Sequence, residues 1–225
     1  MTRRWETALV ALCLAVAGLV AFAIGFGGTA TYESIMRAYA PATFHFVAGD
    51  AVPPDARIDL PVLARYHAAW FAYVTGDAQD PPISFGAEVF TRDEYAHMRD
   101  VRRVFVGARV LAVIAAAVAG LLLVRAWRRD ARAVLVLARD ASVVAGFGVA
   151  VLGLVASIAF DPLFLLFHRI VFPQGNFLFA PDSNLLAIYP DAYWYEVTIR
   201  VGLTFVAATV VIAVAAGATL RRIRR

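Results

Sequence analysis

Histidine is the side chain best suited to moving a proton near neutral pH, and this chain of 225 residues has four of them: His45, His67, His97 and His168. His97 is distinctive because acidic residues lie three or four positions away on both sides: Asp93, Glu94 and Asp100. On a helix these spacings put side chains on one face, and a neighbouring carboxylate orients an imidazole and favours its charged form. We interpret His97 as a candidate acid or base supported by these acids. A solvated histidine beside a membrane is the alternative.

His168 lies in an apolar stretch at 162–172, where Arg169 is the only other charged residue. Both side chains can snorkel towards lipid headgroups. Alternatively, His168 projects into a dry aromatic site as an acid or base, with Arg169 in support. Two histidines from different segments at one membrane level favour a paired catalytic site of His97 and His168. For His45 and His67 we favour a structural role.

Composition excludes several kinds of chemistry. All 21 basic residues are arginine, so a lysine Schiff base and a GxxxxGK[ST] phosphate loop are absent. Cys13 is the only cysteine, which rules out an intrachain disulfide and a CxxC pair. GxSxG and HExxH motifs are missing too. We expect no metal or other cofactor, no nucleotide and no nucleic acid; a haem or metal held by the histidines is a minor alternative.

The histidines must be positioned by membrane helices. Hydrophobic residues form 61% of the chain and charged residues 17%, against about 45–50% and 25% in soluble domains. About 20 mostly apolar residues span a bilayer. The pattern predicts four such helices, near residues 7–28, 101–124, 139–160 and 197–219.

Arginine positions predict the orientation of these helices. Ten arginines cluster in three places: two near the N-terminus, four within 125–138 and four near the C-terminus. The positive-inside rule places all three clusters in the cytoplasm. Of the 17 acidic residues, 14 lie in 29–100 and 161–196, the two segments then expected outside.

The outer segments contain recognisable local elements. A helix is predicted over Leu60–Val74, started by Pro61, and a short strand over Ile83–Phe90. Thr91 and Glu94 form a capping box, and the helix beginning at Arg92 is predicted to continue unbroken into the second span. Asp161 is predicted to cap an interfacial helix with Pro162 in its first turn.

Aromatic residues are dense around these elements. They fit an aromatic belt at the headgroups or an aromatic pocket between cap and membrane, and both interpretations stay open. Arg109, about 10 Å below the entry of its helix at 1.5 Å per residue, is a candidate for holding a substrate headgroup; the alternative is that it pairs with an acid above it. The candidate substrate-pocket residues are Tyr66, Phe172, Phe177, Phe179, Tyr189, Trp194 and Arg109.

The expected fold is an all-α transmembrane four-helix bundle with both termini inside. A small extracytoplasmic cap, mostly helical with short strands, covers it. The segments are the cytoplasmic N-terminus and first span at 1–28, the cap at 29–100, the second span at 101–124, an arginine-rich cytoplasmic loop at 125–138, the third span at 139–160, the interfacial helix and aromatic outer loop at 161–196, and the fourth span with a basic tail at 197–225.

Two blocks of the sequence resemble a known family. The run TRDEYAHMRDVR at 91–102 is similar to the S/T-x-x-E-x-x-H-M-x-D-V-K signature of the lipoprotein intramolecular transacylase (Lit) family. FH at 167–168, VF at 171–172, GNFLF at 175–179 and NLLAIYP at 184–190 resemble its second block. Arg102, Phe177 and Tyr189 stand where lysine, tryptophan and phenylalanine are usual.

The resemblance implies an enzyme of the bacterial cytoplasmic membrane that crosses it several times and has its active site at the outer leaflet. Its partner would be the N-terminus of a diacylglyceryl-modified lipoprotein, besides membrane lipid. The sn-2 acyl chain would move to the α-amino group of the N-terminal cysteine and give a lyso-form lipoprotein. The two catalytic histidines of the family map onto His97 and His168. A non-catalytic membrane protein whose cap binds a partner in envelope assembly is the competing hypothesis.

Overall fold

The computed structural model describes residues 2–45, 55–82 and 89–223. Contacts divide the chain into two compact units. Unit 1 comprises 1–23, 108–158 and 198–225, and unit 2 comprises 24–107 and 159–197. Unit 2 therefore contains the whole of the two segments, 29–100 and 161–196, that the arginine pattern assigned to one side.

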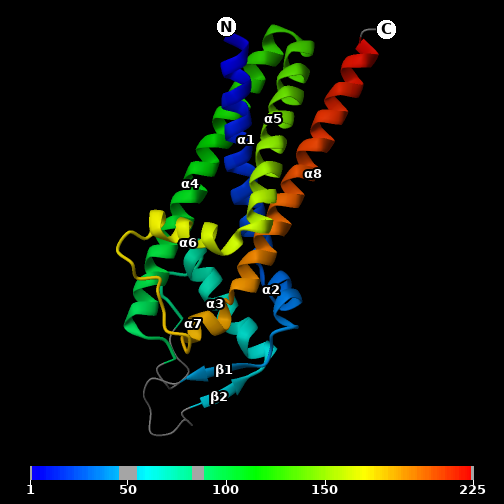
Figure 1. The fold of residues 1–225 in the computed structure, drawn as a ribbon. Helices are drawn as coiled ribbons and strands as arrows, with labels where there is room; N and C mark the ends of the chain where they lie inside the picture. The colour runs from blue at the N-terminus through cyan, green and yellow to red at the C-terminus, as the bar shows by residue number, and fades with distance from the viewer. Residues whose placement is uncertain (1, 46–54, 83–88, 224–225) are drawn as a thin grey trace. The chain divides into compact units, whose positions relative to one another are not determined.

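Unit 1 is made of helices that run side by side (Figure 1). They are α1 (Thr2–Phe26), the later part of α4 (Arg92–Arg129), α5 (Ala131–Ile158) and the later part of α8 (Asp191–Ile223). Val10 of α1, Ala141 of α5 and Phe205 of α8 are buried in one cluster. Gly146 lets α5 approach α8 closely, because a Cβ atom there would collide with Thr209. Small residues serve this purpose where apolar helices pack in lipid.

Within the described residues, four helices are long and apolar enough to cross a membrane: α1 (from Arg4), α4, α5 and α8. Large apolar side chains on them are exposed, such as Phe147 at 71% and Ile158 at 80%, as expected of lipid-facing positions. The four predicted spans are confirmed as helices.

The loop predicted at 125–138 is wrong, since α4 continues to Arg129 and α5 begins at Ala131. Arginine and alanine favour helix, so only Asp130 interrupts it.

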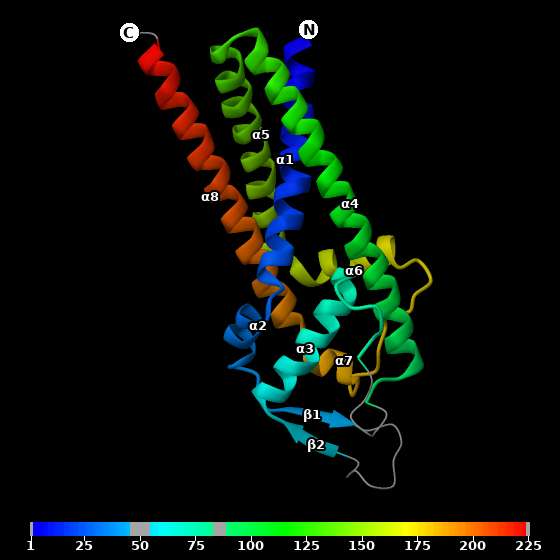
Figure 2. The ribbon, with the colours of Figure 1, turned by 180° about the vertical axis from the view of Figure 1, so that it is seen from behind.

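Unit 2 combines short helices with one hairpin. Besides the first turns of α4 and α8, its elements are α2 (Thr29–Met36), β1 (Ala42–His45), β2 (Asp55–Ile58), α3 (Leu60–Thr75), α6 (Phe160–Val171) and α7 (Asn184–Ile188). β1 and β2 are antiparallel, with Ala42 opposite Ile58. Figure 2 shows the same elements from behind.

Several local predictions for unit 2 are confirmed. The helix predicted over Leu60–Val74 is α3. The structure adds its two caps: the side chain of Asp59 accepts a hydrogen bond from the Val62 backbone N–H at the start, and Gly76 ends the helix with φ of 89°. The left-handed conformation favours glycine at this position. At the start of α4, the Thr91 backbone N–H donates to the Glu94 carboxylate over 2.7 Å and the Glu94 N–H donates to the Thr91 hydroxyl. The capping box is therefore formed, and α4 runs on without a break.

Two other expectations have different outcomes. The strand predicted at 83–90 falls largely outside the described residues, and the two described strands lie elsewhere. The prediction that Asp161 caps α6 is wrong, because the helix begins at Phe160 and its cap residue is Ala159 with φ of −129° and ψ of 45°. Asp161 and Pro162 thus lie inside the first turn, where an acid suits the helix dipole and proline is tolerated.

His67 has the structural role expected of it. It is 1% exposed, its Nε2 lies 2.8 Å from the Gly27 carbonyl and its Nδ1 lies 3.2 Å from the Tyr189 hydroxyl. Its ring stacks on Tyr32 at a centroid distance of 4.0 Å. An N–H donated to Gly27 leaves Nδ1 to accept from Tyr189, so a neutral ring satisfies both contacts. His67 thereby joins α3 to the segments before α2 and after α7.

Unit 2 is expected to lose stability in mild acid because of His67. Burial lowers the pKa of His67 from 6.5 to about 4, against a smaller opposing effect of the Gly27 carbonyl. Between these values the unfolded chain binds the proton and the folded chain does not, so stability falls as the pH drops from 7 towards 4. The loss at pH 5 is about 2 kcal/mol. Thermal unfolding at pH 7 and pH 5 measures it, and His67→Gln should be less stable at pH 7 but less sensitive to pH. An unchanged pH response in His67→Gln would contradict this account.

Candidate active site

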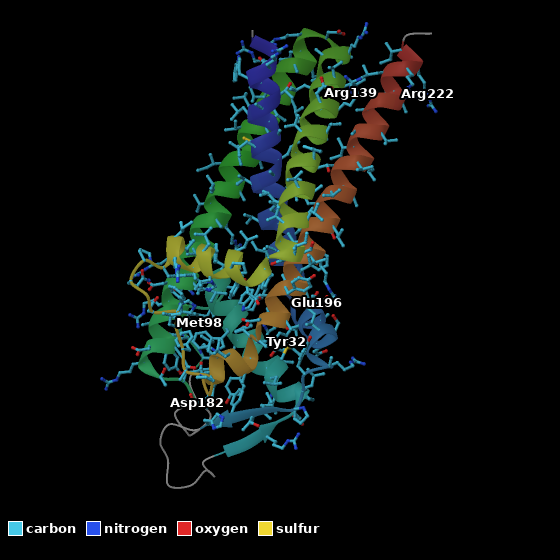
Figure 3. The ribbon with its side chains drawn as sticks, viewed as in Figure 1. Tyr32, Met98, Arg139, Asp182, Glu196 and Arg222 are labelled. Atoms are coloured by element: carbon cyan, nitrogen blue, oxygen red, sulfur yellow. The ribbon has the colours of Figure 1, made fainter. Side chains whose placement is uncertain are left out.

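The two candidate catalytic histidines come from different helices of unit 2. His97 lies in the second turn of α4 and is 7% exposed. His168 lies near the end of α6 and is half-buried. Both views place α6 beside the first turns of α4 (Figures 1 and 2). Met98, which follows His97, marks this part of α4 in Figure 3.

The two imidazole rings lie near each other with almost parallel planes. Their centroids are 6.2 Å apart and their planes differ by 21°. Phe172 contacts both rings, with centroids 4.8 Å from His97 and 5.5 Å from His168. Further aromatic contacts to one ring or the other come from Phe164, Phe167, Phe177 and Phe179. The histidines therefore sit in an aromatic, largely apolar environment.

Hydrogen bonding distinguishes the two rings. Nδ1 of His168 lies 2.8 Å from the Phe164 carbonyl oxygen, which can only accept, so Nδ1 carries the proton. In the neutral ring Nε2 is then the proton acceptor. Nδ1 of His97 is buried and has no hydrogen-bond partner among the described residues. An unpartnered buried polar atom is costly, and it is common where a ligand completes the site.

Asp100 holds the loop after α6 against α4. Its Oδ2 accepts hydrogen bonds of 2.8 Å from both Gln174 and Asn176, and its Oδ1 pairs with Arg103 at 2.6 Å. The sequence interpretation had Asp100 supporting His97 directly. The described hydrogen bonds link Asp100 to the loop that carries Phe177 and Phe179, and its negative charge also acts on His97, where it raises the pKa of the imidazole against the larger lowering by burial. Asn176 also interacts with His97, so the loop connects the acid with the imidazole.

Glu94 joins α4 to α7. Besides its part in the capping box, its Oε1 accepts hydrogen bonds from the Ser183 hydroxyl at 2.5 Å and from the Leu185 backbone N–H at 3.0 Å. Glu94 is 2% exposed, and no described contact links it to His97. The other two proposed supporting residues, Asp93 and Arg169, are exposed.

The predicted substrate-pocket residues divide into groups. Phe172, Phe177 and Phe179 contact the histidine pair, and Trp194 contacts Phe164, which lies 4.2 Å from His168. Tyr189 instead packs in the cluster around His67, and Tyr66 packs against Phe44 and Phe90. Arg109 belongs to unit 1, about 18 Å along α4 from His97 at 1.5 Å per residue. Among the described residues, no group of three or more His, Cys, Asp or Glu side chains is arranged to hold a metal ion.

The sequence reading overlooked polar residues that organise this unit. Asn184 accepts from the His45 N–H and donates to the carbonyls of His45 and Val89, all at 2.6 to 2.8 Å. The sequence assigned no role to Gln174, and Asn176 and Asn184 appeared there only within the second family block. The only sequence feature that could have pointed to these residues is that three amides, Gln174, Asn176 and Asn184, lie before and after the aromatic pair Phe177 and Phe179. Uncharged amides in an aromatic loop carry no periodicity that points to a partner.

Four apolar helices and a histidine site built by unit 2 define a multi-pass membrane protein with a candidate proton-transfer centre. A family profile described as "Lipoprotein intramolecular transacylase Lit" matches residues 52–194. This is more than half of the chain, and the chain belongs to that transacylase family.

The fold agrees with solved structures. The membrane-integral lipoprotein intramolecular transacylase Lit from Bacillus cereus superposes with a TM-score of 0.74 at 13% identity, covering 99% of this chain and 98% of that one. Two variants of that protein, with one histidine changed to arginine or alanine, give TM-scores of 0.70 and 0.71. An uncharacterized protein of Aquifex aeolicus is 30% identical over 127 residues, which is 52% of each chain. Identities this low to the solved structures establish the fold only.

Proposed function

We propose that this protein moves the sn-2 acyl chain of a diacylglyceryl lipoprotein onto the α-amino group of its N-terminal cysteine. The observation that carries the proposal is the pair of imidazoles 6.2 Å apart within an aromatic wall. Membership of the transacylase family supports it. The product is an N-acyl, S-monoacylglyceryl lyso-form lipoprotein.

The chemical step requires proton movement but no outside reactant. The amine nitrogen attacks the ester carbonyl carbon, a C–N bond forms, and the bond between that carbon and the glyceryl oxygen breaks. One N–H proton leaves the amine and one proton reaches the departing alkoxide. A single base that takes the first proton and returns it to the oxygen balances the reaction.

His168 is our candidate for that base. Its Nδ1–H is occupied by the Phe164 carbonyl, which orients the ring and leaves Nε2 free to accept. His97 is buried, and burial favours a neutral imidazole. A neutral His97 can donate its N–H to the oxyanion that develops on the ester, and such donors stabilise the transition state.

The aromatic residues have a separate task in this proposal. Donor ester and acceptor amine belong to one molecule, so the enzyme must fold the substrate until the two groups meet. Fixing such a geometry is worth several kcal/mol of the barrier. Phe172, Phe177 and Phe179 would confine the lipid-modified cysteine and exclude the water that competes with the amine.

Mass analysis of one lipoprotein's N-terminal lipopeptide tests the proposed function. Incubation with the purified protein should leave the intact mass unchanged, while fragmentation should place one acyl chain on nitrogen. Loss of an acyl mass would identify a deacylase and contradict the proposal. An unchanged fragmentation pattern would favour a non-catalytic role.

Both termini are expected in the cytoplasm, which places the histidine site at the outer leaflet. Ten arginines in three clusters support this orientation. A phosphatase reporter, which works only outside the cytoplasm, should be active after Gly76 and silent after Arg225. The reverse pattern would overturn the orientation and with it the proposed access to lipoproteins.

Asp100→Asn should slow acyl transfer about tenfold, because even a small displacement of the aligned reacting groups lowers the reaction rate by a large factor. The amide that replaces one carboxylate oxygen turns a donor towards Gln174, Asn176 or Arg103 and loosens the loop that carries the aromatic wall. Turnover of a synthetic lipopeptide measures the effect. Arg103→Gln is the matched control, since the Arg103 side chain is 74% exposed and exposed ion pairs contribute little. Equal rates in both variants would remove the positioning role of Asp100.

A further inference from the structure

Unit 1 contains a cavity that the proposed reaction does not use. It has a volume of about 980 Å³ and opens among α1, α4, α5 and α8. Small residues of α8 border it, including Ala213, Gly217 and Ala218, so α5 and α8 leave the space between them unfilled. This volume is near the upper limit of the range that is typical of small-molecule binding sites, about 300–1,000 Å³.

The lining of this cavity is strongly basic. Arg129, Arg132, Arg139 and Arg221 face it, against the acids Glu6 and Asp130. Figure 3 labels Arg139 on α5 and shows Arg222 of α8 at the same end of unit 1. The arginines outnumber the acids, so the site favours an anion.

Two of the four arginines are already neutralised within the chain. Arg129 forms an ion pair with Glu6 at 3.1 Å, and Arg139 pairs with Asp140 at 2.7 Å. The side chains of Arg132 and Arg221 form no ion pair or hydrogen bond with the described residues. They are therefore available to an anionic ligand. Guanidinium groups suit phosphate because their planar N–H donors match its oxygens.

The remaining walls are apolar and belong to membrane helices. Val136, Leu137 and Val143 of α5 and Val214 of α8 line them. A cavity lined by both arginines and aliphatic side chains fits an amphiphile with a phosphate headgroup and acyl chains. Basic cavities of this kind between transmembrane helices are typical sites for anionic lipid headgroups.

We propose that this cavity binds an anionic phospholipid, with the phosphate at Arg132 and Arg221 and an acyl chain along Val143 and Val214. The lipid fills the space between α5 and α8 and thereby stabilises unit 1. A zwitterionic phospholipid carries its own positive charge and gains less from the unpaired arginines. The site is independent of the histidine pair and of the proposed acyl transfer.

Native mass spectrometry of the full-length protein in detergent tests the proposal. Phosphatidylglycerol should remain bound where phosphatidylcholine does not. The double variant R132Q/R221Q should weaken binding of phosphatidylglycerol roughly 10- to 30-fold, from the usual contribution of each arginine near a lipid surface. R125Q/R222Q is the matched control, because it removes the same charge from the last turns of α4 and α8, outside the cavity lining. It should change binding less than twofold.

A second pair of variants tests whether lipid binding needs the space of the cavity and not only the positive charge around it. Ala213→Phe fills the cavity without changing charge and should also displace phosphatidylglycerol, whereas Ala215→Phe, outside the lining, should not. Monodisperse elution and the helical circular dichroism signal verify folding. Equal retention of phosphatidylcholine, equal loss in R125Q/R222Q, or full competition by inorganic phosphate alone would each overturn the proposal.

Discussion

Glutamine in place of either His97 or His168 should reduce acyl transfer by about 10²–10⁴-fold, the usual contribution of general acid–base catalysis. Glutamine retains hydrogen-bonding ability but cannot take up and return a proton. If the rings, 6.2 Å apart, serve one proton-transfer step, the double variant should be little worse than either single variant. Initial rates on a diacylglyceryl lipopeptide, at matched protein amounts, measure the effect.

The other two histidines provide the controls for this experiment. His45→Gln and His67→Gln lie outside the pair, and each should retain most of the activity at neutral pH. His67→Gln should instead lower thermal stability, since His67 is 1% exposed and bridges Gly27 and Tyr189. Nearly full activity in His97→Gln or in His168→Gln would refute the proposed mechanism, whatever the behaviour of the controls.

Glu94→Gln should destabilise unit 2 by about 2–4 kcal/mol, the cost of leaving buried donors unpaired. The Glu94 carboxylate accepts from the N–H groups of Thr91 and Leu185 and from the Ser183 hydroxyl. An amide has only one acceptor oxygen, so its NH₂ must face at least one of these donors. The midpoint of thermal unfolding should fall by roughly 5–15 °C.

Asp93→Asn is the matched control for Glu94→Gln, because it makes the same chemical change one residue earlier in the same turn. Asp93 is exposed, and such surface substitutions usually stay within about 0.5 kcal/mol. Melting curves that coincide for Glu94→Gln and wild type would show that Glu94 does not hold α7 to α4. A drop of the same size in both variants would attribute the effect to the charge of the first turn instead.

The membrane spans and most local elements could be read from the sequence because they depend on neighbouring residues. Uninterrupted apolar runs predicted the long helices, Pro61 predicted the start of α3, and the Thr91–Glu94 pair predicted the start of α4. The sequence predicted a loop at 125–138 because this segment is rich in arginine, but all of it except Asp130 is helical. Charge marks the exit from a membrane, but it does not end a helix made of residues that favour helix.

The pairing of candidate site residues depended on the tertiary structure. The sequence could single out His97 and His168, since their residue types and surroundings are unusual, and the family signature covers both. It could not show that Asp100 contacts Gln174 and Asn176 and that Glu94 contacts Ser183 and Leu185. These partners are 74 to 91 positions apart, and no local rule relates residues at such a separation. Only the packing of α6, α7 and the loop between them against α4 decides which donor meets which carboxylate, because a buried acid must be satisfied by whatever group the fold brings to it.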